Sequence, residues 1–268
     1  MKGGHPMKER VIAIALLMSA VAPSLLAQGR LERVLAGRGR VVDLTHRLNP
    51  AIPYWPGEQY RPFEFRTIAT LERDGVFSGF FAMPEHMGTH VDAPNHFVAG
   101  QVSVDRLRPE QLIAPAVVID VREKVARNPD YQLMVEDIRQ WERRYGRIPR
   151  GAVVFMYTGW GARWGNPEAY RNRDAQGVMH FPGFSPEAAE FLVHQRQIHG
   201  IGIDTLSVDF GPSRDFRVHH IMHGAGKYHL ENVARLGLLP PRGAIVVIGV
   251  LPIEGGSGGP ARIFAFLP

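Results

Sequence analysis

The run AVVFMYTGW at residues 152–160 begins as an unbroken apolar stretch, without the alternation that a half-buried strand has. A second run of this kind, PAVVIDV, lies at residues 115–121. Short continuous apolar runs are typical of strands that are buried on both faces. Between them, VEDIRQWERRY at residues 135–145 repeats its apolar residues with the period of a helix. These segments predict an α/β fold in which helices cover a sheet.

Further strands are spread along the rest of the chain. We expect them in residues 39–48, in residues 63–75 with a turn at the end, in the stretch leading into residues 86–96, in residues 198–209, and as a pair joined by a Gly-rich loop in residues 243–267. One more helix begins at the N-cap Ser185, with Pro186 in its first position, and another lies around residues 219–223. Because no linker or internal repeat interrupts this pattern, the predicted architecture is a single α/β domain over residues 28–268 with a mixed sheet.

Composition excludes several kinds of chemistry. The chain has 268 residues, 45% of them hydrophobic, and it contains no cysteine. Disulfides, thiolate metal sites, iron–sulfur clusters and a cysteine nucleophile are therefore ruled out, so that histidine and carboxylate side chains must hold any metal. The formal net charge is +5, and +3 remains without residues 1–27. The charges are interspersed, and we expect no nucleic-acid partner.

The N-terminus has the pattern of an export signal. Lys2, Lys8 and Arg10 precede an apolar stretch that ends in small residues, so we expect residues 1–27 to be a signal peptide. The alternative is a membrane anchor, but the uninterrupted apolar run at residues 11–22 falls short of the roughly 20 residues that span a bilayer. The pattern therefore predicts a periplasmic or secreted protein that has no membrane partner once the signal is removed.

Candidate metal ligands are concentrated in HMGTHVDAPNH at residues 86–96. His90 and Asp92 share a face of an extended segment because side chains alternate there. Imidazole and carboxylate together suit zinc or manganese. Gly88 permits a backbone conformation that other residues resist, and Pro94 stiffens the exit. The alternative is a polar loop bridged by its histidines, but four ligand-type residues in eleven positions favour a metal site.

This stretch resembles the HxGTHxDxPxH signature of the cyclase family, which includes bacterial kynurenine formamidases and isatin hydrolases. VVDLTHRLNPAIPYWPG (41–57), GIGIDTLSVD (200–209), HHIMHGAGKYHLEN (219–232) and residues 240–265 resemble further segments of the family. The likeness covers nearly all of residues 28–268. It implies a swivelling β/β/α fold, a divalent metal cofactor (two Zn²⁺, with Mn²⁺ as the alternative) and a homo-oligomer, either a dimer or a tetramer.

The resemblance also implies a role for individual residues. The family's first metal is held by the residues that match His86, His90 and Asp92, with the aspartate reaching a second metal. His219 and Glu231, twelve apart as in the family, match the remaining ligands of that second metal, and His220 is the alternative to His219. His96 matches the acid/base residue. Two divalent metals about 3.5–4 Å apart lower the pKa of water, and a neighbouring imidazole can carry the proton to the leaving nitrogen.

Other residues have less distinctive surroundings. Aromatic side chains are usually core, but Trp55 lies in a Pro-rich loop, and we expect it and Phe97 to face a ring-shaped substrate. His46 follows a strand and is interpreted as structural. Asp204 is a candidate to orient a ligand. At least one of the two remaining nearby histidines, His223 and His229, is interpreted as a bystander.

Three hypotheses for the function follow. The first is a metal-dependent hydrolase of a small amide, with an aryl formamide of the N-formylkynurenine type as the leading substrate. The second keeps this mechanism with a cyclic amide or lactam, as in the isatin hydrolases. The third is a non-catalytic periplasmic protein that binds a metal or ligand, which would have no need of His96 beside its metal. A serine hydrolase is disfavoured because the chain has no GxSxG motif.

Overall fold

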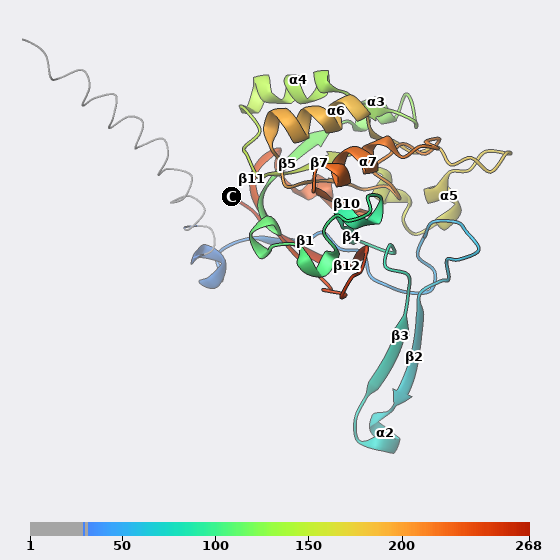
Figure 1. Cartoon of the computed structure of the whole chain (residues 1–268). Coiled ribbons are helices and arrows are strands. Elements are labelled where there is room, and N and C mark those ends of the chain that lie inside the picture. Colours follow the sequence, from blue (N-terminus) through green and yellow to red (C-terminus); the bar gives the residue numbers. More distant parts are fainter. Residues whose placement is uncertain (1–28, 30–31) are drawn as a thin grey trace, which may run out of the picture.

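A computed structural model describes residue 29 and residues 32–268, and the predicted signal peptide lies outside the described residues. Its main element is an eight-stranded mixed sheet that closes on itself (Figure 1). The strand order is β1-β12-β11-β5-β7-β9-β10-β4, and β4 pairs with β12 as well as β10, which joins the ends into a barrel. The bounds are β1 Val41–Asp43, β4 His90–Asp92, β5 Ile113–Asp120, β7 Val153–Tyr157, β9 Gly200–Ile203, β10 Tyr228–Glu231, β11 Arg242–Val250 and β12 Gly258–Phe266.

The central strands are parallel and the flanking strands antiparallel. β5, β7, β9 and β10 run in one direction, and β4, β11 and β12 pair antiparallel with their neighbours. Residues 153–156 of β7 are fully buried, because the barrel core covers one face and helices cover the other. This is the environment that the continuous apolar run predicts.

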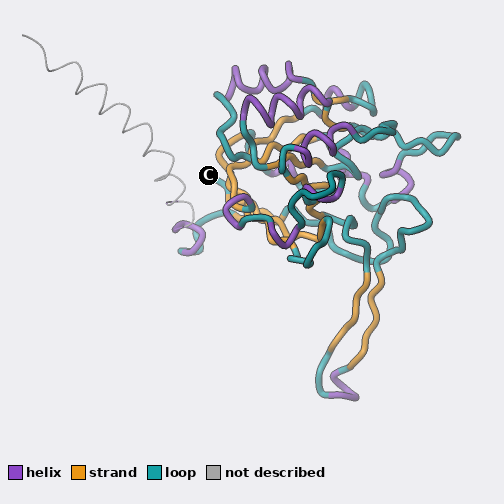
Figure 2. The backbone as a smooth tube through the Cα atoms, viewed as in Figure 1, coloured by secondary structure: helices purple, strands orange, loops and turns teal. Residues whose placement is uncertain are grey.

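The longer helices lie along one side of the barrel, and short helical segments lie elsewhere, including the tip of the hairpin (Figure 2). α4 and α6 pack beside each other over the sheet (Figure 1). Ser185 is the N-cap of α6, and its side chain accepts a hydrogen bond from the Ala188 N–H. The helices are α2 Leu71–Asp74, α3 Arg122–Val125, α4 Val135–Tyr145, α5 Pro167–Arg171, α6 Pro186–Glu190, which continues as a π-helix over Phe191–Arg196, and α7 Arg217–Gly224.

A long hairpin projects from the barrel (Figure 1). It consists of β2 Glu64–Ala69 and β3 Ser78–Ala82, joined by α2 at its tip, and the two strands pair only with each other. Gly75 ends α2 in the left-handed conformation with φ 70°. A separate two-stranded sheet joins β6 Gln132–Leu133 and β8 Gly183–Phe184.

The α/β class, the mixed sheet and the principal helices are confirmed, and one local prediction needs correction. The strand before residues 86–96 does not deliver the histidine motif, because β3 ends at Ala82 and the motif forms its own strand, β4. The helix expected around residues 219–223 is α7, and β10 after it is a strand that the sequence analysis did not predict. Within residues 32–268, no helix has the length and apolar character needed to cross a bilayer.

Candidate metal centre

β4 supplies two polar side chains to one face of the barrel wall. Val91 points into the barrel core, so His90 and Asp92 point outward, where α7 covers them. Gly88 precedes the strand with φ 66°, the left-handed region that glycine adopts without strain. This turn aims the Gly88 carbonyl at His90 Nδ1, 2.9 Å away, so that Nε2 of His90 faces the cluster.

β10 adds two more side chains at matching positions. It pairs antiparallel with β4 in a register that sets His229 opposite Asp92 and Glu231 opposite His90. Leu230 between them points into the barrel core. The period of two along each strand therefore places four ligand-type side chains on one outward patch of the wall. Each of the four is at most 5% exposed.

α7 brings His219 over this patch. Asp209 accepts hydrogen bonds from the backbone N–H groups of Val218 and His219, and its Oδ2 lies 2.6 Å from His219 Nδ1. That contact turns Nε2 of His219 toward Asp92 and Glu231, 3.5 Å from an oxygen of each. His220 is exposed and packs against Phe97, so the structure places His219 rather than His220 in the cluster.

His86 is held at the edge of the cluster by the loop before β12. Its Nδ1 lies 2.7 Å from Asp92 Oδ1 and its Nε2 lies 2.9 Å from the hydroxyl of Ser257. Ser257 in turn donates to Glu85 at 2.6 Å. Gly258 must be a glycine here, because a Cβ at that position would lie 2.6 Å from the His86 ring. The Gly-rich loop is thus a turn between strands that also supports a candidate ligand histidine.

His96 lies beside the cluster rather than in its centre. Pro94 begins a 3₁₀ turn over Pro94–His96, which directs the His96 ring back toward Asp92. Its ring stacks on His86 with centroids 3.8 Å apart, and its Nε2 is 3.7 Å from Asp92 Oδ2. Burial lowers the pKa of His96 to about 3 against the opposing effect of Asp92, and the neighbouring imidazoles lower it further. The ring is therefore neutral at neutral pH.

The donor atoms have the character of a metal site. Burial alone would lower the pKa values of His90 and His219, but the facing carboxylates outweigh it and raise them to about 9 and about 10. Nε2 of His90 is buried without a hydrogen-bond partner although it lies 2.9 Å from Asp92 Oδ1. A buried imidazole nitrogen that faces carboxylate oxygens and has no hydrogen-bond partner is a candidate metal donor, and imidazole and carboxylate donors suit zinc or manganese.

A cavity of about 200 Å³ opens onto these side chains. Its volume is below the range for drug-sized ligands, so it suits a small ring-shaped molecule. Both expected substrate residues, Trp55 and Phe97, line it, and Phe97 packs 4.3 Å from the His219 ring. Two further wall residues are Tyr60, whose pKa is raised by burial and by the nearby carboxylates, and Phe216. Phe216 has φ 46°, a strained conformation typical of functional sites.

Four other residues can now be placed. Asp204 accepts hydrogen bonds from Thr158 and does not contact a candidate ligand, so the orienting carboxylate is Asp209 instead. His229 is not a bystander, because its Nε2 lies 2.9 Å from Asp92 Oδ2. The i, i+2 spacing of His229 and Glu231 on a strand could have revealed this, had β10 been predicted. No sequence pattern could predict the contact of Ser257 with His86, because 171 residues separate the two.

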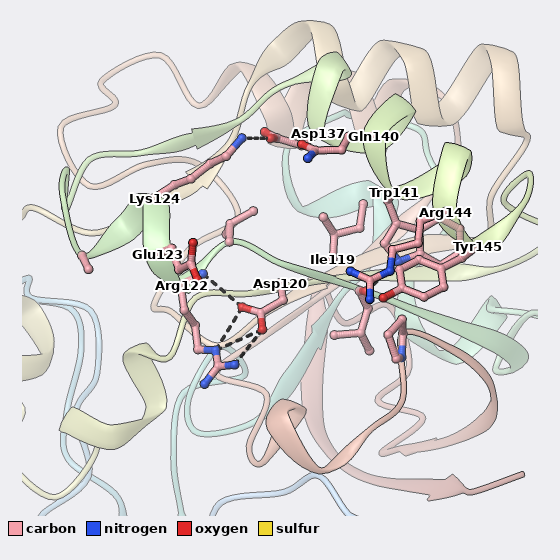
Figure 3. A pocket seen from close by; sticks show the side chains of 14 residues that line it. Ile119, Asp120, Arg122, Glu123, Lys124, Asp137, Gln140, Trp141, Arg144 and Tyr145 are labelled. Carbon is pink, nitrogen blue, oxygen red and sulfur yellow. Dashed lines mark hydrogen bonds and ion pairs between the residues drawn. The ribbon is translucent and has the colours of Figure 1, made fainter.

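A larger cavity of about 780 Å³ lies elsewhere, between β5, α3 and α4 (Figure 3). Four of its charged groups form ion pairs, Arg122 with Asp120 and Lys124 with Asp137. None of the residues that line it is a histidine. The smaller cavity is therefore the candidate for metal chemistry, because histidine and carboxylate side chains converge there.

Comparison with known proteins shows the family and the fold of the chain. The model of the Cyclase family matches residues 42–210. The chain is 34% identical to an isatin hydrolase of Roseibium aggregatum, over 88% of this chain and 95% of that protein, and 30% identical to a kynurenine formamidase of Geobacillus thermodenitrificans, over 82% and 94%. Among solved structures, isatin hydrolase A from Ralstonia solanacearum matches with a TM-score of 0.84 at 35% identity, covering 100% of both chains. Isatin hydrolase A from Labrenzia aggregata bound to benzyl benzoate matches with a TM-score of 0.84 at 36% identity, covering 90% of this chain and 98% of that one.

Proposed function

Because the chain belongs to the Cyclase family, we propose that it is a metal-dependent hydrolase of a small aromatic amide. The observation that carries this proposal is the convergence of His86, His90, Asp92, His219 and Glu231 beside a cavity with His96 on its wall. A bound divalent metal supplies Lewis acidity, which lowers the pKa of water and polarises a carbonyl. Zinc and manganese both suit the donors.

The surrounding residues have distinct roles in this proposal. His96 lies on the cavity wall with its Nε2 3.7 Å from Asp92 Oδ2, so its imidazole is placed to accept a proton from the attacking water and return it to the leaving nitrogen. Trp55 and Phe97 hold the aromatic ring of the substrate. Tyr60 keeps its proton, because burial raises its pKa, and so presents a hydrogen-bond donor on the cavity wall.

A cyclic amide of the isatin type is the substrate we favour, and an aryl formamide of the N-formylkynurenine type is the second candidate. Support for the cyclic amide comes from the relatives, since the isatin hydrolases match with higher identity and over a larger share of the chain. The small aromatic cavity suits a fused bicyclic ring, whereas a longer formamide must extend from it. The two reactions use the same site residues.

The test compares substrates and variants on one metal-loaded preparation. We expect isatin to be hydrolysed faster than an aryl formamide. His96→Ala should retain its metal and lose 10²- to 10⁴-fold in kcat, because general acid–base catalysis contributes about that much. His220→Ala is the matched control, since it removes an exposed imidazole near the site and should keep full activity. Absence of turnover on isatin, aryl formamides, lactams and lactones alike would instead favour a non-catalytic binding protein.

We also propose that the protein is a homo-oligomer built through the hairpin β2–β3. The hairpin exposes seven large apolar side chains, each at least 40% accessible: Phe65, Ile68, Leu71, Val76, Phe77, Phe80 and Phe81. Such a hairpin is marginally stable alone, so a covering partner is expected. We estimate its apolar surface at about 600 Å² from typical side-chain areas. Two hairpins together reach the roughly 1,200 Å² at which specific interfaces begin, which favours a second copy of this chain as the partner.

Export is the remaining part of the proposal. The positive and apolar pattern of residues 1–27 supports removal of a signal peptide and a periplasmic or secreted location. Mass spectrometry of the natively expressed protein is expected to find a new N-terminus after Ala22 or Ala27. An intact Met1 on the mature protein would contradict it.

A further inference from the structure

The two oxygens of Asp92 face different sets of donors. Oδ1 lies 2.7 Å from His86 Nδ1 and 2.9 Å from His90 Nε2. Oδ2 lies 2.9 Å from His229 Nε2 and 3.5 Å from His219 Nε2. The carboxylate therefore divides the cluster into two groups and belongs to both.

Glu231 makes the same division from the opposite strand. Its Oε2 lies 3.6 Å from His90 Nε2, on the side of the first group. Its Oε1 lies 3.5 Å from His219 Nε2 and 3.4 Å from His229 Nε2, on the side of the second group. The backbone N–H of Val208 donates to Oε1 at 3.0 Å and fixes the carboxylate in this orientation.

The second group has the dimensions of a tetrahedral metal site. Ligand atoms that lie 2.0–2.1 Å from a tetrahedral zinc are about 3.3 Å apart. The four measured separations among Asp92, His219, His229 and Glu231 are 2.9, 3.4, 3.5 and 3.5 Å, and all four donor atoms lie within 4.8 Å of one another. A hydrogen bond from His229 to Asp92 would account for the 2.9 Å separation between these two residues. It would not account for the 3.4 Å separation between His229 Nε2 and Glu231 Oε1.

We propose that His229 is a metal ligand and completes a closed, four-donor site with Asp92, His219 and Glu231. The first group, His86, His90 and Asp92 Oδ1, is joined by Glu231 Oε2, which lies 3.6 Å from His90 Nε2, and it faces the cavity. Four protein donors, as in the second group, are the number typical of structural zinc. The assignment rests on the proposed function only in requiring that the cluster hold metal.

His223 provides the matched control. Its ring stacks on that of His229, with centroids 4.7 Å apart and planes 8° apart, and it is fully buried. It lies outside the group of donors that converge on Asp92. His223→Gln therefore removes a buried imidazole from the same place without removing a proposed ligand.

The first experiment titrates metal-free protein with Zn²⁺ and counts bound equivalents by elemental analysis after desalting. Wild type and His223→Gln are expected to hold two equivalents, and His229→Gln is expected to bind the second at least 10-fold more weakly. Unchanged stoichiometry and affinity in His229→Gln would overturn the assignment. Equal losses in both glutamine variants would overturn it too, since packing alone would then explain them.

A second variant distinguishes loss of a metal ligand from a folding defect, because it is expected to produce a new spectroscopic band. The chain contains no cysteine, so His229→Cys introduces its single thiol. With Co²⁺ bound, a thiolate ligand is expected to produce a charge-transfer band in the near ultraviolet, and its absence in a folded, Co²⁺-loaded variant would overturn the proposal. These readings need no substrate. If the protein gives the expected Zn²⁺ stoichiometry and the Co²⁺ charge-transfer band but hydrolyses no amide, the proposed function is contradicted and the assignment of His229 stands.

Discussion

Histidine side chains in this protein differ in pKa according to what faces them. His90 and His219 face carboxylates, which raise their pKa values above that of a free imidazole. His223 faces other imidazoles in a buried position, and its pKa is lowered. His46 stacks on Trp164 at 3.9 Å, and burial together with the charge of Arg235 lowers its pKa to about 4. The structural interpretation of His46 agrees with this packing.

Because the pKa of His46 is lowered in the folded protein, we expect the free energy of unfolding to decrease in acid. Between pH 6.5 and 4 the unfolded chain binds a proton at this residue and the folded chain does not, so acidification favours unfolding. The loss should approach about 3 kcal/mol at pH 4, since one pKa unit corresponds to about 1.4 kcal/mol. Denaturant unfolding of wild type and His46→Phe, which keeps the ring stacking without a titrating group, measures it. Parallel pH profiles for the two proteins would contradict it.

At the scale of elements, the hairpin β2–β3 has apolar residues on both of its faces. Phe65 pairs across the strands with Phe81, while Phe80 lies on the other face under Arg66. No layer of the described chain covers the ribbon, although β-strands usually bury at least one face. The tip residues Leu71 and Phe77 contribute little to the hairpin's own pairing and are 64% and 59% exposed.

Charged residues at the tip are expected to disrupt the assembly. Leu71→Lys with Phe77→Lys should shift the protein from oligomer to monomer, because each introduces an unpaired charge into an apolar contact. Sedimentation velocity measures the mass, with Glu72→Gln at the same tip as the control. The metal content should stay at the wild-type level, since the tip is remote from the cluster. A monomeric wild type, or a double variant of unchanged mass, would contradict a hairpin interface.

At the scale of the whole molecule, barrel closure assembles the site. β4 lies between β10 and β12, so residues 90–92, 228–231 and 258–260 are neighbours in one sheet. α7 then crosses over β10 and carries His219. A metal held by the proposed ligands would link parts of the chain that are up to 145 residues apart, from His86 to Glu231, and it should therefore stabilise the folded state as a whole.

Removal of metal should lower the melting temperature. A ligand present at 100 times its Kd stabilises the native state by about 2.7 kcal/mol. For a chain of this size that amounts to roughly 5–10 °C per site. Calorimetry with and without EDTA measures the shift, and His90→Ala should show a smaller one because it has lost a ligand. An identical melting temperature for metal-loaded and EDTA-treated wild type would contradict this role.

The sequence alone was sufficient for the class of fold and for half of the cluster. Continuous apolar runs predict buried strands because hydrophobic period and burial are local properties. His86, His90, Asp92 and His96 could be proposed together because they lie within eleven residues. The family resemblance added His219 and Glu231 by their spacing, a relation that the residues alone do not reveal.

Only the tertiary structure decided which of the other histidines and carboxylates join the site. Asp209 rather than Asp204 orients His219, and His229 enters the cluster because β10 pairs with β4 in one particular register. Ser257 reaches His86 across 171 residues through the closure of the barrel. Strand register and sheet closure depend on the packing of the whole core, and no local pattern specifies them.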